Sequence, residues 1–403
     1  MTLKYDCVVI GAGVAGLLCA YRLEKKGLRV MVFEADPLRV GGRAYDVEFE
    51  GVNVDLGAGV IRSGDARLKH LLKELSISTV EFKSSANYKF DYFNVSKLET
   101  TLREKARKYR EEILEHRLTF REFLYNYFKP EQANRIIYQW GFTDQLETDV
   151  FDVLENYYIS DIDYKDQRYA SIIGGWNRLI DRLKSNIEVR HEAVRVVKKI
   201  SDTNYRYRVI AGVSEVDTKC VVCAVDIGGF NKIQFVGVDT TAITAAVGGI
   251  EFVRIYAKCN ESIDLLPEFA IVASPISKII VIDRKHKVFM SVYADNQNAV
   301  YWKNMDDDKL KLCVNRHLGQ ALDVEVPEIK SILKKYWDVG VHYYKPRGLV
   351  EDSDIRQIVH DLQRVDVGLF AIGEMLSTHH GWTEGAVESV DMTIKDIIKA
   401  ATY

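Results

Sequence analysis

The sequence predicts an α/β protein in which a discontinuous nucleotide-binding domain carries an inserted α+β domain for substrate. Three observations support this prediction. An apolar run at residues 7–10 leads directly into three glycines with the spacing G-x-G-x-x-G. A second apolar run follows a helical stretch and ends at an acid, Glu34. The chain has 403 residues without an obvious flexible linker, so two interwoven domains are expected.

The first run, CVVI, has the continuous apolar pattern of a strand that is buried on both faces. The glycines that follow suit a strand–turn–helix unit of Rossmann type. Gly11 permits the tight turn, Gly13 lets a pyrophosphate approach the backbone, and Gly16 lets the helix pack against the strand. Glu34 lies about 20 residues later, where a carboxylate accepts from ribose hydroxyls. These features predict a dinucleotide site, with a plain βα turn and a coincidental acid as the alternative.

The next segment favours FAD over NAD. Residues 35–46, ADPLRVGGRAYD, place two glycines and Arg43 just after the acid. The glycines expose the backbone, and the guanidinium can neutralise a pyrophosphate through forked hydrogen bonds. Residues 52–61, VNVDLGAGVI, predict a strand that ends in a turn of small residues. Such a turn can pass closely against a flat ring.

Together these stretches resemble the flavin-dependent amine oxidase family, which includes monoamine, polyamine and L-amino-acid oxidases. The matching stretches are collinear and span most of the chain: VVIGAGVAGL, VFEADPLRVGGRA, VDLGAGVI, SIIGGWNRLIDRL, IEVRHEAVRVVKKI and LFAIGEMLSTHHGWTEGAVESVDMTIKDI. The resemblance implies bound FAD. It assigns the adenosine ribose to Glu34 and the adenine to the main chain of Val194. The remaining assignments are Arg43 with the backbone near Ala15 and Gly42 for the pyrophosphate, and Gly59 and Val60 for the isoalloxazine.

The C-terminal stretch predicts a buried strand that ends at Gly373 and Glu374, followed by a helix that begins near Thr383. A helix start offers unpaired N–H groups and a positive dipole end. The resemblance implies that this end faces the flavin, where negative charge develops on reduction. Glu384 is expected to be a capping acid in the first turn. Trp382 is implied to form one aromatic wall of a substrate cage, where a ring face attracts cations.

The opposite wall is assigned to the aromatic strand at residues 336–348, with His342 as the favoured residue. Some relatives attach the flavin through a cysteine in this region. No cysteine occurs between residues 336 and 348, so FAD is expected to be non-covalent. Attachment through His342 stays a remote alternative.

The resemblance is incomplete at one catalytic position. Many relatives carry a lysine that holds a water near the flavin, and that position falls on Glu251 or Phe252. Arg254 and Lys258 are displaced from it, so the lysine is predicted to be absent. Arg62 is expected to be a surface residue. The alternative is that it binds the carboxylate of a substrate.

The cofactor domain is predicted at residues 1–75, 168–246 and 346–403, and the substrate domain at 76–167 and 247–345. The first insert is expected to form solvated helices because its apolar positions lie among charges of both signs. These apolar positions are Leu102, Leu114, Leu118, Phe120, Phe123 and Leu124. The second insert is expected to mix strands with a helix near residues 307–320.

Composition predicts where the protein acts and which partners it lacks. The formal net charge is -3, which does not imply a general nucleic-acid-binding face. No long apolar run or charged leader is present, so neither a membrane helix nor secretion is expected. Cys7, Cys19 and Cys223 lie in apolar segments and are expected to be buried thiols. A reduced, cytoplasmic location is therefore predicted.

The favoured function is oxidation of a small amine to an imine, with hydride transfer to the flavin and reoxidation by dioxygen to give hydrogen peroxide. One alternative is a desaturase or protoporphyrinogen-type oxidase, which shares the cofactor motifs. Another is a flavoprotein with little turnover and a binding or structural role, which the missing lysine supports. The sequence names neither the amine nor the oligomeric state.

Overall fold

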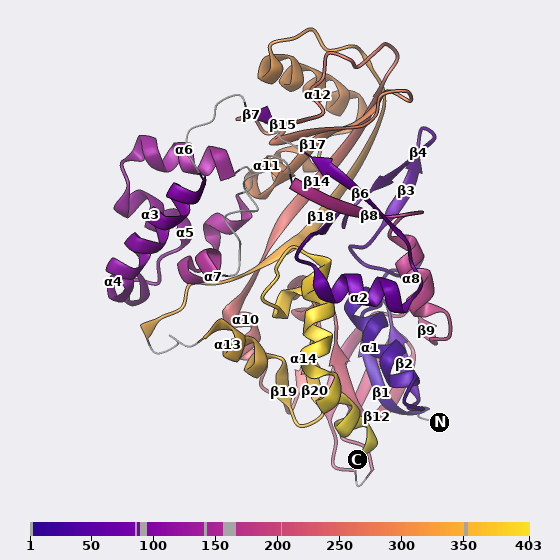
Figure 1. Ribbon diagram of the computed structural model, residues 1–403. Coiled ribbons are helices and arrows are strands. Elements are labelled where there is room, and N and C mark those ends of the chain that lie inside the picture. Colours follow the sequence, from indigo (N-terminus) through magenta and orange to yellow (C-terminus); the bar gives the residue numbers. More distant parts are fainter. Residues whose placement is uncertain are drawn as a thin grey trace.

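The computed structural model describes residues 3–84, 87–88, 95–140, 143–155, 167–202, 204–349 and 354–403. Two large β-sheets dominate it, and a group of helices lies to one side of both (Figure 1). This arrangement confirms the predicted α/β fold, with a mostly parallel sheet and a separate, mostly antiparallel one. None of the helices described in the structure is both long and apolar enough to cross a bilayer.

The first sheet is built around β1, which pairs in parallel with β2 on one side and β12 on the other. Strand β20, from the C-terminal part of the chain, pairs in parallel with β12. The N-terminal and C-terminal motifs therefore meet in one sheet. Its strands are β1 (Leu3–Ile10), β2 (Val30–Phe33), β9 (Val189–Arg190), β10 (Val194–Lys199), β11 (Tyr207–Ala211), β12 (Ser214–Cys223), β13 (Gln234–Val236), β19 (Arg364–Asp366) and β20 (Leu369–Ala371).

Both faces of this sheet are covered, which explains the uninterrupted apolar run of β1. One face carries α1 (Val14–Glu24), α2 (Ala66–Glu74), α8 (Asn177–Lys184) and α14 (Thr383–Thr402). The other face carries α9 (Ile227–Phe230), α10 (Thr241–Ala246) and α13 (Ile355–Leu362). Cys7, Cys19 and Cys223 are buried in these layers, as predicted.

The second sheet has the strand order β18-β14-β17-β16-β15-β7, and its pairs are antiparallel except β15 with β7. Its strands are β7 (Asn87–Tyr88), β14 (Val247–Cys259), β15 (Phe269–Ile271), β16 (Lys278–Asp283), β17 (Val288–Asp295) and β18 (Ile329–Tyr344). One face packs on α11 (Asn296–Lys303) and on α12 (Asp307–Leu322), the helix predicted near residues 307–320. The opposite face packs on the hairpin of β3 (Asp46–Phe49) and β4 (Val52–Asp55).

The first insert forms the helical group at the side of the molecule (Figure 1). Its elements are α3 (Val95–Lys108), α4 (Arg110–Glu115), α5 (Phe120–Tyr127), α6 (Pro130–Trp140), the 3₁₀ turn η1 (Asp144–Glu147) and α7 (Val150–Glu155). All six apolar positions predicted for this insert are buried in one cluster. A small sheet of β5 (Ile61–Arg62), β6 (Thr79–Ser84) and β8 (Gln167–Ile172) borders the insert in sequence.

The strands of the first sheet fall within the segments predicted for the cofactor domain, and those of the second sheet fall within the segments predicted for substrate. The division into two domains stays a prediction.

Buried acids fasten the helical insert to the rest of the chain. Asp149 accepts hydrogen bonds from the backbone N–H and the guanidinium of Arg347, both at 2.9 Å, and the two side chains are only 3% and 8% exposed. Asp295 on β17 accepts from the N–H groups of Thr143 and Asp144. These contacts link residues more than a hundred positions apart.

Asp149→Ala should lower the free energy of unfolding by about 3–5 kcal/mol, because it leaves the buried Arg347 without this carboxylate. Glu147→Ala removes the more exposed ion pair with Arg121 in the same insert, and should cost about 1 kcal/mol or less. Urea denaturation of both variants measures the difference. Equal losses in the two variants would contradict the anchoring role.

Candidate functional site

The turn between β1 and α1 has the geometry that the glycine spacing predicts. Gly11 has a φ of +101°, which favours glycine. A Cβ at Gly16 would lie 2.0 Å from the carbonyl oxygen of Gly11, so the helix can approach only with glycine there. A Cβ at Gly13 would meet no atom within 4 Å. The backbone at Gly13 therefore borders open space at the start of α1, beside Ala15.

The acid at the end of β2 lies against this turn. Glu34 accepts hydrogen bonds from the backbone N–H groups of Ala12 at 2.8 Å and Asp36 at 2.9 Å. An ionised carboxylate has further acceptor positions for ribose hydroxyls. Val194 begins β10, in the stretch that follows His191, whose ring lies 2.6 Å from the carbonyl of Asp36. The residues assigned to the adenosine are thus near one another.

The loop that contains Gly41 and Gly42, called the two-glycine loop, lies beside the turn between β1 and α1. Gly41 donates its N–H to the carbonyl of Ala12 at 2.7 Å. A Cβ at Gly42 would lie 3.4 Å from the Cα of Gly13, and Gly42 has a φ of +58°. The loop and the first turn therefore border one space. Arg43 does not simply point into it, because its guanidinium lies 2.8 Å from Glu374 and donates to the carbonyl of Gly340.

Glu374 is a buried carboxylate that contacts Arg43, His342 and Gly381. Its carboxylate is 6% exposed, lies 2.5 Å from Nδ1 of His342 and accepts from the N–H of Gly381. Burial alone would raise the pKa of Glu374, but Arg43 and His342 outweigh it and hold the pKa well below its usual range. The carboxylate is therefore ionised and joins three distant segments.

The position of His342 conflicts with the expected role as a cage wall. The side chain is completely buried, and its Nε2 accepts from the backbone N–H of Ile227 at 3.1 Å. With Nδ1 against Glu374, both ring nitrogens are engaged in the interior. Strand alternation identified the face of the strand that His342 shares with Tyr344, but not that this face turns toward the core.

The segment Asp55–Val60, which contains the Gly59 and Val60 assigned to the flavin ring, is fastened to the second sheet. The carbonyl of Asp55 accepts hydrogen bonds from Arg254 at 2.8 Å and from the hydroxyl of Tyr256 at 2.5 Å. The indole N–H of Trp337 donates to the carbonyl of Leu56 at 2.7 Å. The side chains of β14 and β18 thus fix the path of this segment.

The start of α14 lies at the other border of the site. Trp382 is the N-cap residue of α14. Its side chain accepts no hydrogen bond from the first N–H groups of the helix, which begin at Thr383. Gly373 is buried with a φ of +120°, and a Cβ there would meet no atom within 4 Å. A buried glycine beside empty space indicates a cradle for a bound group.

Arg62 is not the surface residue that the sequence suggested. Its side chain is 12% exposed and forms an ion pair with the buried Asp65 at 2.9 Å. Its guanidinium also lies 4.0 Å from the centre of the Trp382 ring. A cation therefore already covers part of the indole that is predicted to receive the substrate.

Glu384 does cap a helix, but the helix is α2. Its carboxylate accepts from the backbone N–H groups of Arg67 at 3.1 Å and Leu68 at 2.8 Å. The side chain is 2% exposed. This contact joins the starts of α2 and α14, and no local pattern predicts it because the partners lie more than 300 residues apart.

The residues present fit FAD. Two helix starts without side-chain caps, at Gly13 and Trp382, offer N–H donors for anionic parts of the molecule. Open space borders Gly13 and the buried Gly373. Glu34 supplies an acceptor for the ribose. An anionic dinucleotide that ends in a flat ring matches this set of donors, acceptors and space.

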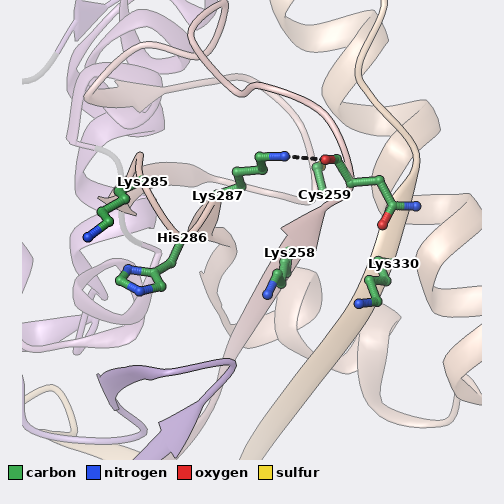
Figure 2. Close-up of a pocket in the computed structure, with 7 residues that line it drawn as sticks. Lys258, Cys259, Lys285, His286, Lys287 and Lys330 are labelled. Atoms are coloured by element: carbon green, nitrogen blue, oxygen red, sulfur yellow. Dashed lines mark hydrogen bonds between the residues drawn. The ribbon is translucent and has the colours of Figure 1, made fainter.

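A second hollow, of about 290 Å³, lies at the far end of β14 (Figure 2). Its lining is Lys258, Cys259, Asn260, Lys285, His286, Lys287 and Lys330. Lys258 donates to Glu50 at 2.9 Å, and Lys287 donates to the carbonyl of Asn260. Gly249, which pairs with His342, lies nine residues along the strand, roughly 30 Å away. The hollow is therefore separate from the candidate cofactor site.

Glu374→Gln should lower the free energy of unfolding by about 3 kcal/mol at neutral pH, because it removes the ionised partner of Arg43. The folded pKa of Glu374 lies below the unfolded value of about 4.3. The stabilisation is therefore complete above the unfolded pKa and is lost as pH falls through the folded pKa. Denaturation at several pH values should show a constant difference from about pH 7 to about pH 5. A difference that vanishes by about pH 5 would refute the assignment.

The profile of the family described as flavin containing amine oxidoreductase matches residues 14–390. Amine oxidase [flavin-containing] B of Sus scrofa is 42% identical over 80 residues, 20% of this chain and 15% of that protein. Protoporphyrinogen oxidase 2 of Arabidopsis thaliana is 44% identical over 69 residues, 17% of this chain and 13% of that protein. The matched stretches therefore span only a small part of these relatives.

Solved structures match over nearly the whole chain. A cofactor-binding variant of putrescine oxidase superposes with a TM-score of 0.80 at 17% identity, covering 99% of this chain and 100% of that one. Cyclohexylamine oxidase from Brevibacterium oxydans superposes with a TM-score of 0.79 at 16% identity and the same coverage. These structures support the fold, and the family profile covers most of the sequence. The protein belongs to the flavin containing amine oxidoreductase family.

Proposed function

We propose that the protein binds FAD non-covalently and oxidises a small amine to an imine. One observation carries the proposal. Helices α1 and α14 both begin without a side-chain cap, and open space borders the backbone at Gly13 and Gly373. Trp382 begins the second of these helices, so an aromatic ring stands at the border of the same region. The family to which the chain belongs supports the reaction class.

The residues that hold the cofactor are proposed from their places around the open space. The start of α1, with Gly11, Gly13, Ala15 and Gly16, receives the pyrophosphate through backbone N–H groups. Gly42 lies beside it, and Arg43 lends positive charge while it remains paired with Glu374. The adenosine is assigned to Glu34 and Val194. The flavin end is assigned to Gly59, Val60, Gly373 and Thr383.

When bound, FAD would supply the redox chemistry: a hydride, which carries two electrons, would leave the amine carbon for the flavin, and the amine nitrogen would lose a proton to solvent as the imine forms. Dioxygen would then take up the two electrons and two protons to give hydrogen peroxide. The chain supplies orientation and electrostatics. The positive end of α14 is assigned to the flavin ring, where negative charge develops on reduction. Trp382 orients the amine against the ring, while Arg62 holds the indole in place by stacking on it.

The position of the family lysine is assigned to Glu251 or Phe252, neither of which is a cation. Phe252 lies on β14 with its ring centre 5.1 Å from that of Tyr293. This environment favours an apolar wall in place of an ammonium. A desaturase-like reaction, or a flavoprotein with little turnover, would also account for the missing lysine. The test with a panel of amines distinguishes these two alternatives from amine oxidation.

Gly13→Val should weaken FAD binding about tenfold or more, ~1.4 kcal/mol, because the side chain enters the space proposed for the pyrophosphate. The apoprotein should keep its stability within about 1 kcal/mol, since no atom lies within 4 Å of the new Cβ. Gly16→Val is the contrast, because its Cβ meets the Gly11 carbonyl and should cost about 3 kcal/mol or more. Flavin titration and urea denaturation separate the two effects. Unchanged FAD affinity in Gly13→Val would reject the proposed site.

Trp382→Ala should slow anaerobic reduction of the flavin by a small amine about 10–100-fold, ~1.4–2.7 kcal/mol, with FAD content unchanged. Trp382→Phe keeps an aromatic face and should retain most of the rate. Absorbance spectra of the wild type with a panel of mono-, di- and polyamines and amino acids identify the substrate class. A bound flavin that stays oxidised with every amine would favour the alternatives named above.

A further inference from the structure

Arg254 is a buried cation on the face of the second sheet that packs against the segment Asp55–Val60. It is 8% exposed and lies in the middle of β14, between apolar residues. Its Nη1 donates to the carbonyl of Asp55 at 2.8 Å and its Nη2 to the hydroxyl of Tyr293 at 3.1 Å. The guanidinium also lies 4.6 Å from the centre of the Tyr293 ring. All three partners are electrically neutral groups.

A buried charge with neutral partners is costly unless an anion balances it. Across the residues that the structure describes, no carboxylate oxygen forms an ion pair with Arg254. Burial works to lower the pKa of Arg254, but Tyr293, Tyr256 and Asp55 outweigh it and raise the pKa, so the group stays charged. Burial raises the pKa of Asp55 to about 7, and Arg254 opposes this rise only in part. Near neutral pH, Asp55 therefore balances the cation incompletely.

The incompletely balanced charge of Arg254 faces Gly59. A side chain at Gly59 would begin 3.2 Å from Nη1 of Arg254 and 3.4 Å from Oδ2 of Asp55. Tyr256 fixes the same segment through its hydrogen bond to the carbonyl of Asp55. The guanidinium therefore lies against the backbone that is assigned to the flavin ring, and it is held there before any ligand binds.

We infer that Arg254 provides the fixed positive charge that stabilises the anionic, reduced form of the bound flavin. This inference rests on the proposed FAD site. A charge near the reactive ring is one of the ways in which a protein tunes a flavin. Because the group is preorganised and shielded from water, its effect on developing negative charge is strong. Among the described residues, Asp46 on β3, Tyr256 on β14 and Lys278 on β16 are further ionisable groups near Asp55 or Tyr293.

A purely structural role for Arg254 would depend on its hydrogen bonds and not on its charge. Arg254→Lys keeps the charge, whereas Arg254→Met removes it and keeps an unbranched apolar side chain. Lys258→Met is the matched control, because it removes a cation from the same strand at its far end. Sulfite provides the readout, since this anion adds to oxidised flavin and places a negative charge on the ring without an external reductant.

Sulfite affinity and the two-electron potential are measured on FAD-loaded protein in the absence of any amine. Arg254→Met should raise the sulfite dissociation constant about tenfold or more, and lower the potential by about 30 mV for each tenfold change in the reduction equilibrium. Arg254→Lys and Lys258→Met should stay within about threefold of the wild type, well under one such tenfold step. A folded, FAD-loaded Arg254→Met protein with wild-type values would overturn the inference. So would equal losses in the Met and Lys variants.

Asp55→Asn tests the same charge in the opposite direction and does not require Arg254 to be changed. At about pH 8 the Asp55 carboxyl is mostly ionised, so its removal should tighten sulfite binding several-fold. Unchanged or weaker binding would count against the inference even if Arg254→Met failed to fold. If the sulfite affinities change as expected but no amine reduces the bound flavin, amine oxidation is rejected and the role of Arg254 stands. A protein that binds no FAD would overturn both.

Discussion

One buried carboxylate holds the candidate site together. Glu374 lies within ion-pair distance of Arg43 and beside His342, and it accepts from the backbone of Gly381. These partners come from the two-glycine loop, from β18 and from the approach to α14. An ionised group at 6% exposure is stable only with such partners, so the cluster either forms as a unit or not at all. The relative position of the two helix starts follows from it.

The second sheet holds the other side of the candidate site. β14 and β18 are the longest strands described, and their side chains fasten the segment Asp55–Val60 from the opposite side. The first sheet thus supplies backbone donors and open space, and the second supplies a wall of fixed side chains. A cofactor placed between them would meet positive potential from the starts of α1 and α14 and from Arg254.

The sequence was most informative where one residue type satisfies a local geometric need. Gly11 and Gly16 have the backbone angle and the close approach that their spacing predicts, and the apolar positions of the helical insert are buried. It was least informative where a side chain chooses between distant partners. Nothing near Arg43 or Glu384 along the chain indicates that their partners lie about 300 residues away. For Arg254 a signal existed, because one arginine interrupts the apolar run of residues 252–257.

The pairing of β20 with β12, and the packing of α14 on α1, also bear on how the protein is made. The N-terminal half of the cradle emerges first from the ribosome, but Gly373 and the start of α14 follow some 350 residues later. Contacts of such long range form slowly because a large loop must close first. The cradle of the nascent chain is therefore incomplete until α14 has formed, and until then residues 221–223 of β12 lack their partner strand β20.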